Sequence, residues 1–411
     1  MKILRIIARL NVGGPARHVV WLTKALNDTQ FESTLIAGTV PDGEEDMAYF
    51  AVEEGVAPVF VSELSRELSP KDAISLIKLY REMRRQRPDI IHTHTAKAGT
   101  VGRTAAFLYR WLTWGSLVGR PRSVKVVHTF HGHVFHSYYG KLRTRLFIVI
   151  EKMLARVATD QIITISQQQF HEINERFRVG RKDQFRIVPL GIDLAGFATP
   201  GAKSNIVRDE IGAGRNDLVV GFVGRLTGIK NLTLLIDAAG RIAGDADDQG
   251  HMRFVLIGDG ELRESLEERA RERGANSVVT FLGNRTNVAE HLAGLDIMAL
   301  TSKNEGTPLS LIEGMAAGVP FVSTAVGGVI DLAGMRTQEE DGFWVCERGI
   351  LAEPGSVDSL AKALIYLAKN EELRKNLSIK GREFVASRYS KERLVADIRS
   401  LYLELTGEEQ N

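Results

Sequence analysis

Two carboxylates, Glu305 and Glu313, are separated by seven residues within the stretch 302–318. A carboxylate offers two acceptor oxygens, which suit a pair of neighbouring hydroxyl groups on a ribose or another sugar. If a helix starts at Pro308, Glu313 lies inside it and Glu305 lies in the loop before it, with about 6 Å along the axis between Leu309 and Glu313. The free N–H groups at such a helix start bind anions. The stretch therefore predicts a site for a diphosphate with hydroxyl-bearing groups on either side.

The elements around this stretch can be predicted from its neighbours. An apolar run at residues 295–300 predicts a buried strand that ends just before it. Thr307 is expected to be the N-cap, Pro308 the first helical residue, and Gly318 the left-handed residue that ends the helix after Ala317. In open α/β sheets ligands bind at the carboxyl ends of strands, which favours a site over a surface helix with incidental glutamates.

Two cations follow another apolar run, at residues 218–223. Gly224 and Arg225 come directly after it, and Lys230 lies five residues further on. If both side chains reach one site, they neutralise a diphosphate without a metal; the alternative is a pair of solvated surface cations. Gly13 and Gly14 follow the N-terminal apolar run in the same way, and glycine lets a backbone approach a ligand closely.

Length and composition limit the class of protein. The chain has 411 residues, which favours two domains, and strands alternate with helices in both halves. A net charge of +2 argues against wholesale nucleic-acid binding, and the single Cys346 excludes an intrachain disulfide. The turn at Gly258 and Gly260 lacks the third glycine of a dinucleotide fingerprint, so a nicotinamide dehydrogenase is disfavoured.

The N-terminal apolar run is interrupted by Arg5 and Arg9, so it is interpreted as a first strand and not as a signal peptide. No uncharged apolar run approaches the roughly 20 residues that a spanning helix needs. We therefore expect a cytoplasmic protein, with contact to the inner face of a membrane left open.

Histidines gather after two predicted strands and suggest zinc. They are His92, His94, His128, His131, His133 and His136. No cysteine is near them and they do not obviously converge, so hydrogen-bonding roles for one or two of them are favoured over a metal. Asp245 and Asp247 match a carboxylate pair that holds a metal in some sugar transferases, but their polar surroundings predict a surface turn. No metal is expected.

Residues 103–152 are basic and rich in aromatic side chains. Nine of them are Lys or Arg, and Glu151 is the one acidic residue. Such a segment is typical of contact with an anionic membrane surface, and equally of a helix packed on a sheet with ordinary solvated charges.

Taken together, these motifs resemble family 4 of the retaining glycosyltransferases. The resemblance rests on Glu305 with Glu313, on Arg225 with Lys230, on the Gly13-Gly14 turn, and on Thr129-Phe-His131-Gly, and it covers nearly the whole chain. It implies an α/β fold of the GT-B type, with two Rossmann-like domains facing across a cleft. Residues 1–193 would form the acceptor domain, residues 194–388 the donor domain, and residues 389–411 a helix that packs back on the first domain. Residues 335–346 match the family poorly.

The resemblance also implies roles for single residues. Glu313 would hold the ribose hydroxyls, Glu305 the donor sugar, and Arg225 with Lys230 the departing diphosphate. His131 would lie by the donor sugar. Further donor contacts would come from Gly13, Gly14, Gly224, Arg285, Gly306, Thr307, Pro308 and Leu309. His94 and Lys97 are candidate acceptor contacts.

The resemblance implies a metal-independent, retaining transfer of a hexosyl or N-acetylhexosaminyl group from a nucleoside-diphosphate sugar, with UDP favoured. The local similarity of residues 128–155 is greatest to enzymes of capsule, exopolysaccharide or lipid-linked glycan assembly, which implies a glycan or polyprenyl-linked acceptor. Two alternatives are kept: a GT-B enzyme of another reaction type, such as an epimerase or a phosphorylase, and a non-catalytic sugar-nucleotide or glycan binder.

Overall fold

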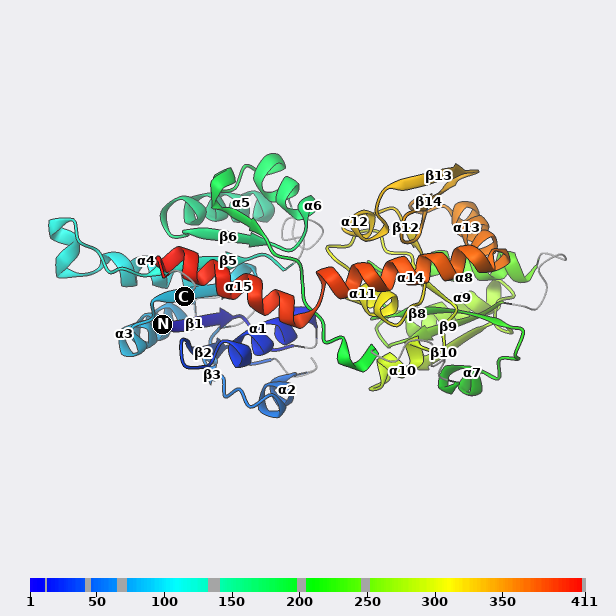
Figure 1. Cartoon of the computed structure of the whole chain (residues 1–411), viewed down its shortest axis with the longest axis horizontal. Helices are drawn as coiled ribbons and strands as arrows, with labels where there is room; N and C mark the ends of the chain where they lie inside the picture. Colours follow the sequence, from blue (N-terminus) through cyan, green and yellow to red (C-terminus); the bar gives the residue numbers. More distant parts are fainter. Residues whose placement is uncertain are drawn as a thin grey trace. The chain divides into compact units, whose positions relative to one another are not determined.

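The computed structural model describes residues 1–11, 13–40, 46–64, 72–131, 141–197, 205–244 and 252–408. The chain forms two compact units, shown in Figure 1. Unit 1 contains residues 1–191 and 391–411, and unit 2 contains residues 192–390.

Unit 1 is built on a parallel sheet of seven strands in the order β3-β2-β1-β4-β5-β6-β7. The strands are β1 (Lys2–Ile7), β2 (Glu32–Ala37), β3 (Val59–Phe60), β4 (Ile90–His94), β5 (Lys125–Thr129), β6 (Gln161–Thr164) and β7 (Phe185–Ile187). The central strands β1, β4 and β5 are buried almost throughout, as expected for a parallel sheet with helices on both faces.

The helices of unit 1 come from both ends of the chain. They are α1 (Gly14–Ala25), α2 (Ala48–Glu53), α3 (Asp72–Gln86), α4 (Ala96–Trp111), α5 (Lys141–Val157), α6 (Gln167–Phe170) and α15 (Lys391–Thr406), with short turns η1 (Trp114–Val118), η2 (His171–Arg176) and η3 (Lys182–Gln184). Helix α15, red in Figure 1, packs Leu394, Ile398 and Tyr402 against core residues such as Ile3. The C-terminal helix is thus part of the core of unit 1.

Unit 2 contains an eight-stranded sheet in the order β10-β9-β8-β11-β12-β15-β14-β13. Its strands are β8 (Leu218–Val223), β9 (Met252–Ile257), β10 (Val279–Gly283), β11 (Ile297–Leu300), β12 (Phe321–Thr324), β13 (Arg336–Glu340), β14 (Phe343–Cys346) and β15 (Ile350–Ala352). The strands from β10 to β15 in this order pair in parallel, whereas β13 and β14 form an antiparallel hairpin at the edge. The hairpin departs from the simple strand–helix alternation expected from the sequence.

The helices of unit 2 cover this sheet. They are η4 (Ala195–Phe197), α7 (Ile206–Ile211), α8 (Leu232–Ala243), α9 (Arg263–Glu272), α10 (Val288–Leu292), α11 (Leu309–Ala316), α12 (Val329–Ala333), α13 (Val357–Lys369) and α14 (Glu371–Arg388). No helix in the described ranges is long and apolar enough to cross a membrane.

Each sheet has a point where the strand order reverses. In unit 1 this point lies between β1 and β4, and in unit 2 between β8 and β11. Loops that leave two such neighbouring strands in opposite directions open a crevice at the carboxyl edge, where open α/β sheets bind ligands. A ligand site is therefore expected at each of these two positions.

Candidate functional site

In unit 2, two predicted residues meet at the reversal point between β8 and β11. Lys230 follows β8, Glu305 follows β11, and Lys230 Nζ lies 2.5 Å from Glu305 Oε1. Ser302 donates its hydroxyl hydrogen to the same carboxylate oxygen at 2.6 Å. The side chains of Lys230 and Glu305 are 21% and 11% exposed, so the pair is only partly shielded from water. Ser302 was not singled out from the sequence; the spacing Ser-x-x-Glu is that of a helix capping box, but no helix starts at Ser302.

Backbone contacts fix the two loops that carry this pair. Thr301 donates from its hydroxyl to the carbonyl oxygen of Lys230 at 2.9 Å, and the N–H of Lys303 donates to the carbonyl of Ile229 at 2.9 Å. Arg225 lies earlier in the β8 loop with its side chain exposed. The loop arrangement therefore holds the Lys230 ammonium in place and leaves the Arg225 guanidinium accessible to a ligand.

The helix after β11 starts one residue later than expected. Helix α11 begins at Leu309, and Pro308 is its N-cap with φ −72° and ψ 108°, so the predicted N-cap at Thr307 is wrong. Pro308 takes this place because its carbonyl accepts the N–H groups of Leu311 and Ile312 at 3.2 and 3.3 Å. The Thr307 hydroxyl is buried and has no hydrogen-bond partner among the described residues.

The end of α11 agrees with the sequence. Ala317 is the C-cap, Gly318 has φ +77°, and the N–H of Val319 closes the last turn on the carbonyl of Gly314 at 2.9 Å. At the other end the N–H groups of Leu309 and Ser310 have no intrahelical acceptor. Glu313 lies one turn into the helix with a partly exposed side chain. The helix thus presents donors at its start and a carboxylate behind them.

A glycine turn supports the loop that carries Glu305. Gly328 donates its N–H to the carbonyl of Glu305 at 3.1 Å. Gly327 has φ +55°, and a Cβ atom there would lie 1.8 Å from the same carbonyl oxygen. Only glycine allows this close approach. The glycine turn therefore has a structural role at the site.

Arg285 follows β10, two strands away from β8. Its Nη2 lies 2.9 Å from Glu210 Oε2, and its Nη1 donates to the carbonyl of Leu282 at 2.5 Å. The hydrogen bond from Arg285 lowers the pKa of the Glu210 carboxyl. The guanidinium is thus held at the α7 side of the sheet, and its contact with a nucleobase stays a prediction.

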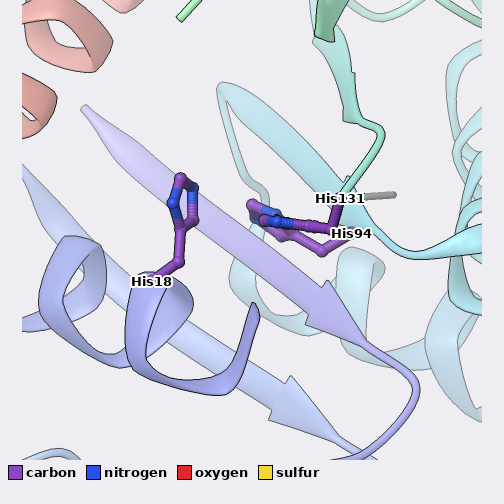
Figure 2. Close-up of side chains that lie close together, drawn as sticks. All are labelled: His18, His94 and His131. Carbon is purple, nitrogen blue, oxygen red and sulfur yellow. The ribbon is translucent and has the colours of Figure 1, made fainter. Parts of the chain in front are cut away.

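In unit 1, three imidazoles gather at the reversal point between β1 and β4, as Figure 2 shows. His18 lies in the helix after β1, His94 ends β4, and His131 follows β5. His94 Nδ1 lies 2.9 Å from His131 Nε2, and the ring centroids of His18 and His131 are 4.8 Å apart. His94 and His131 were predicted site residues, whereas His18 was missed although it lies four residues after the glycine turn.

The environment keeps these imidazoles neutral. Burial lowers the pKa of His131 to about 3. Burial, together with the neighbouring imidazoles, also lowers the pKa of His18 and of His94 well below 6.5. Gly13 is the N-cap of α1 and Gly14 its first residue, so the glycine turn lies at the same edge of the sheet.

The remaining predicted residues of unit 1 are engaged in the core. Lys97 is buried, and its Nζ lies 2.8 Å from Asp72 Oδ1. His92 Nδ1 lies 2.6 Å from the Tyr402 hydroxyl, and His128 Nδ1 lies 2.9 Å from the Thr93 hydroxyl. His133, His136, Asp245 and Asp247 lie outside the described residues.

Both halves of the chain match models of known protein families. The family described as Glycosyltransferase Family 4 matches residues 12–195, and the family described as Glycosyl transferases group 1 matches residues 204–384. UDP-Gal:alpha-D-GlcNAc-diphosphoundecaprenol alpha-1,3-galactosyltransferase of Escherichia coli is 29% identical over 86% of this chain and 85% of its own length. The lipopolysaccharide core biosynthesis glycosyltransferase LpsE of Rhizobium meliloti is 24% identical over 96% of this chain and 95% of its own.

Solved structures show the fold. Alr3699/HepE of Anabaena, in complex with UDP, superposes with a TM-score of 0.76 at 20% identity, covering 98% of this chain and 100% of that one. Sucrose-phosphate synthase of Thermosynechococcus elongatus superposes with a TM-score of 0.74 at 21% identity over the whole of both chains. Fold and matches define a glycosyltransferase of the GT-B class, which confirms the predicted fold class. The chain belongs to glycosyltransferase family 4.

Proposed function

We propose that the chain transfers a hexosyl or N-acetylhexosaminyl group, with retention of anomeric configuration and without a metal, from a UDP-sugar to a hydroxyl of a glycan or polyprenyl-linked acceptor in cell-surface polysaccharide synthesis. The observation that carries the proposal is the convergence of Lys230 and Glu305 at the reversal point of unit 2, beside the start of α11. UDP in the structural neighbour supports the donor, and the lipid diphosphate in the name of the Escherichia coli relative supports the acceptor.

The roles within unit 2 follow from the charge that the reaction builds. Breaking the bond between the anomeric carbon and the diphosphate oxygen places negative charge on the diphosphate and positive charge on the sugar. Arg225, Lys230 and the N–H groups at the start of α11 stabilise the diphosphate, and each such contact is typically worth about 3–4 kcal/mol. Glu313 binds the ribose hydroxyls and Glu305 the donor sugar. Gly306, Thr307 and the Gly224 turn line the donor.

For retention, the acceptor oxygen attacks from the face that the diphosphate leaves, and its proton passes to the departing diphosphate oxygen. His131 and His94, as neutral imidazoles, are hydrogen-bonding groups for the donor sugar and the acceptor, and Gly13 with Gly14 approach the donor phosphates. Lys97 Nζ lies 2.8 Å from Asp72 Oδ1, so Lys97 would have to contact an acceptor while it keeps this ion pair.

A thermal-shift series tests the donor. The protein is heated with UDP, GDP or ADP, each with EDTA, and a nucleotide that binds the folded state raises the unfolding temperature. We expect UDP to stabilise more than GDP and ADP, and Lys230→Ala to reduce the stabilisation by all three, because its ammonium contacts the diphosphate that they share. Equal stabilisation by the three nucleotides would contradict the UDP assignment. Donor turnover that persists in Lys230→Ala and in Glu305→Ala would contradict the site.

An exposed apolar surface on α5 supports the proposal of a lipid-linked acceptor. Helix α5 carries a stripe of exposed apolar residues at helical spacing, flanked by the exposed Arg145, Lys152 and Arg156. The stripe consists of Leu146, Val149, Met153 and Val157, which are 53%, 62%, 55% and 44% exposed. An apolar face bordered by basic residues suits an anionic bilayer surface.

The turn η1 adds an exposed apolar tip, in the cyan segment that projects beyond α4 in Figure 1. Trp114 is 88% exposed and Leu117 is 77% exposed. Glu151, the one acidic residue of the tract, is buried with Arg103, whose Nη2 lies 2.6 Å from its Oε2. Among the described residues of the segment 103–152, the exposed ones therefore carry no acidic charge. We propose that this segment binds an anionic membrane.

Vesicle flotation tests this surface. The protein should float with vesicles that contain anionic phosphatidylglycerol and stay behind with neutral ones. Trp114→Ala with Leu117→Ala should weaken flotation, while Ile379→Ala, at an apolar residue of unit 2 that is 59% exposed, should not. A size that increases with protein concentration, without flotation, would instead assign the surface to a second copy of the chain.

A further inference from the structure

The imidazoles of His18, His94 and His131 reach one point from three different elements, as Figure 2 shows. One nitrogen of each ring lies within 4.8 Å of one nitrogen of the other two. Their side chains come from α1, β4 and the segment after β5, all at the reversal point of the unit 1 sheet. We propose that these three histidines bind a transition-metal ion such as Zn²⁺, and that the bound ion inhibits sugar transfer.

The donor set selects the metal. Neutral imidazole nitrogen suits Zn²⁺, Cu²⁺, Ni²⁺ and Co²⁺, whereas Mg²⁺ and Ca²⁺ require oxygen ligands. Tetrahedral zinc with Zn–N distances of about 2.0–2.1 Å places its nitrogen ligands roughly 3.3–3.4 Å apart. His94 Nδ1 and His131 Nε2 form a hydrogen bond of 2.9 Å, which a bound ion would replace. One ring nitrogen of His18 lies within 4.8 Å of a nitrogen of each of the other two, so binding all three requires rotation of these side chains. Three ligands leave the fourth position open to water or to another ligand.

Unpartnered nitrogens form a second, independent observation. His18 is 3% exposed, and neither of its ring nitrogens has a hydrogen-bond partner among the described residues. The second nitrogen of His94 and that of His131 are buried without a partner in the same way. These two are not the nitrogens of the proposed ligand pair, His94 Nδ1 and His131 Nε2. Buried polar atoms in folded proteins are nearly always satisfied, so it is the two unpartnered nitrogens of His18 that indicate a missing ligand. In contrast, His92 has partners on both ring nitrogens and is not part of the set.

A neighbouring cation limits the affinity. Arg5 is buried nearby, and its charge contributes to lowering the pKa of His18 and of His94. Its guanidinium donates to the hydroxyl of Ser33 at 3.0 Å, a neutral group that does not compensate the positive charge. Its positive charge opposes a dication. We therefore expect binding that a chelator reverses readily, in contrast to a structural zinc site that the fold requires.

Inhibition follows from the position of His131 and rests on the proposed function. A lone pair that binds the metal is not available to the donor sugar, and the ion would occupy the edge where Gly13 and Gly14 approach the donor. The metal therefore competes with catalysis and does not assist it.

The experiment begins with metal-stripped full-length protein. Titration with Co²⁺ is followed by visible absorption, and titration with Zn²⁺ by calorimetry, with Mg²⁺ as competitor. We expect one ion per chain and no effect of Mg²⁺. His18→Gln and His94→Asn should each weaken Zn²⁺ binding about tenfold or more. His171→Ala is the matched control, because His171 is half exposed and pairs with Glu175 at 2.9 Å in another part of unit 1.

X-ray absorption on the unchanged protein covers the case in which a variant fails to fold. We expect about three imidazole nitrogens at roughly 2.0–2.1 Å from zinc. Unchanged Zn²⁺ affinity in His18→Gln, or loss of affinity in His171→Ala, would overturn the site. Metal binding is measured without the donor sugar nucleotide, so the result does not depend on the proposed function. If Zn²⁺ binds but the transfer rate stays unchanged at saturation, the inhibitory role is wrong.

Discussion

The ion pair between Lys230 and Glu305 allows a double-mutant cycle. Lys230→Met keeps the length of the side chain but removes the ammonium that lies 2.5 Å from Glu305 Oε1. That carboxylate then repels the diphosphate. Glu305→Gln removes the repulsion while keeping the hydrogen bond that Ser302 donates to Oε1. The double variant should therefore be less impaired than the two single losses predict.

The coupling energy between Lys230 and Glu305 can be bracketed from the exposure of their side chains. Exposed pairs contribute about 0.2–1 kcal/mol, and breaking a fully buried pair costs about 3–5 kcal/mol. With side chains 21% and 11% exposed, Lys230 and Glu305 lie between these limits, and we expect a coupling energy of about 2 kcal/mol. Since about 1.4 kcal/mol corresponds to a factor of ten, the coupling amounts to roughly 30-fold. Each single substitution should lower turnover by about 10²–10³.

The assay measures release of UDP from the donor sugar in the four proteins of the cycle, together with their unfolding in urea. The double variant should turn over about 30-fold faster than the product of the single effects, by the conversion above. Lys303→Met, an exposed lysine of the same loop, serves as control and should leave both measurements unchanged. Additive effects, within about 0.5 kcal/mol, would refute the reasoning, because independent sites add within that margin.

Three further outcomes can be measured. Glu151→Gln should lower the free energy of unfolding of unit 1 by about 3–5 kcal/mol in urea, since it leaves the fully buried Arg103 without its charge partner; a loss below about 1 kcal/mol would contradict this, because only exposed pairs are worth so little. Gly327→Ala should abolish nucleotide stabilisation in the thermal-shift assay, whereas Gly355→Ala, also at positive φ but with no atom within 4 Å, should retain it. In a variant that keeps Trp114 and has the other three tryptophans replaced by phenylalanine, the fluorescence should shift to the blue with anionic vesicles, and an unchanged spectrum would place Trp114 outside the membrane.

Local patterns predicted the site of unit 2 more completely than that of unit 1. Lys230 and Glu305 each follow an apolar run, and the carboxyl ends of neighbouring parallel strands meet at one edge. Their meeting also depends on the pairing of β11 with β8, which the alternation of strands and helices alone does not predict. The resemblance to the family grouped the two residues in advance. The start of α11 was misplaced by one residue, because the sequence preference of Thr307 for an N-cap does not reveal that the carbonyl of Pro308 takes the first helical hydrogen bonds.

The imidazole cluster could not be found from spacing. His18 and His94 are 76 residues apart in the chain, and they meet only because β4 pairs with β1 on the side opposite to β2. Strand order is a property of the whole sheet and leaves no local mark. The edge hairpin of β13 and β14 was missed for a different reason: β13 reads Arg-Thr-Gln-Glu-Glu and is largely exposed, so it lacks the apolar signal of a strand.

The position of Tyr402 has a consequence for how the protein is made. On the ribosome, residues 1–191 are complete long before α15 is synthesised, and unit 2 is made in between. Until then Arg5 and His92 lack the hydroxyl that lies 3.5 and 2.6 Å from them, and the apolar surface around Ile3 and Phe31 stays uncovered. Unit 1 is therefore translated first but completed last. A fragment that ends at residue 191 should aggregate. The segment 192–390 contains all of unit 2 and can fold before α15 is synthesised.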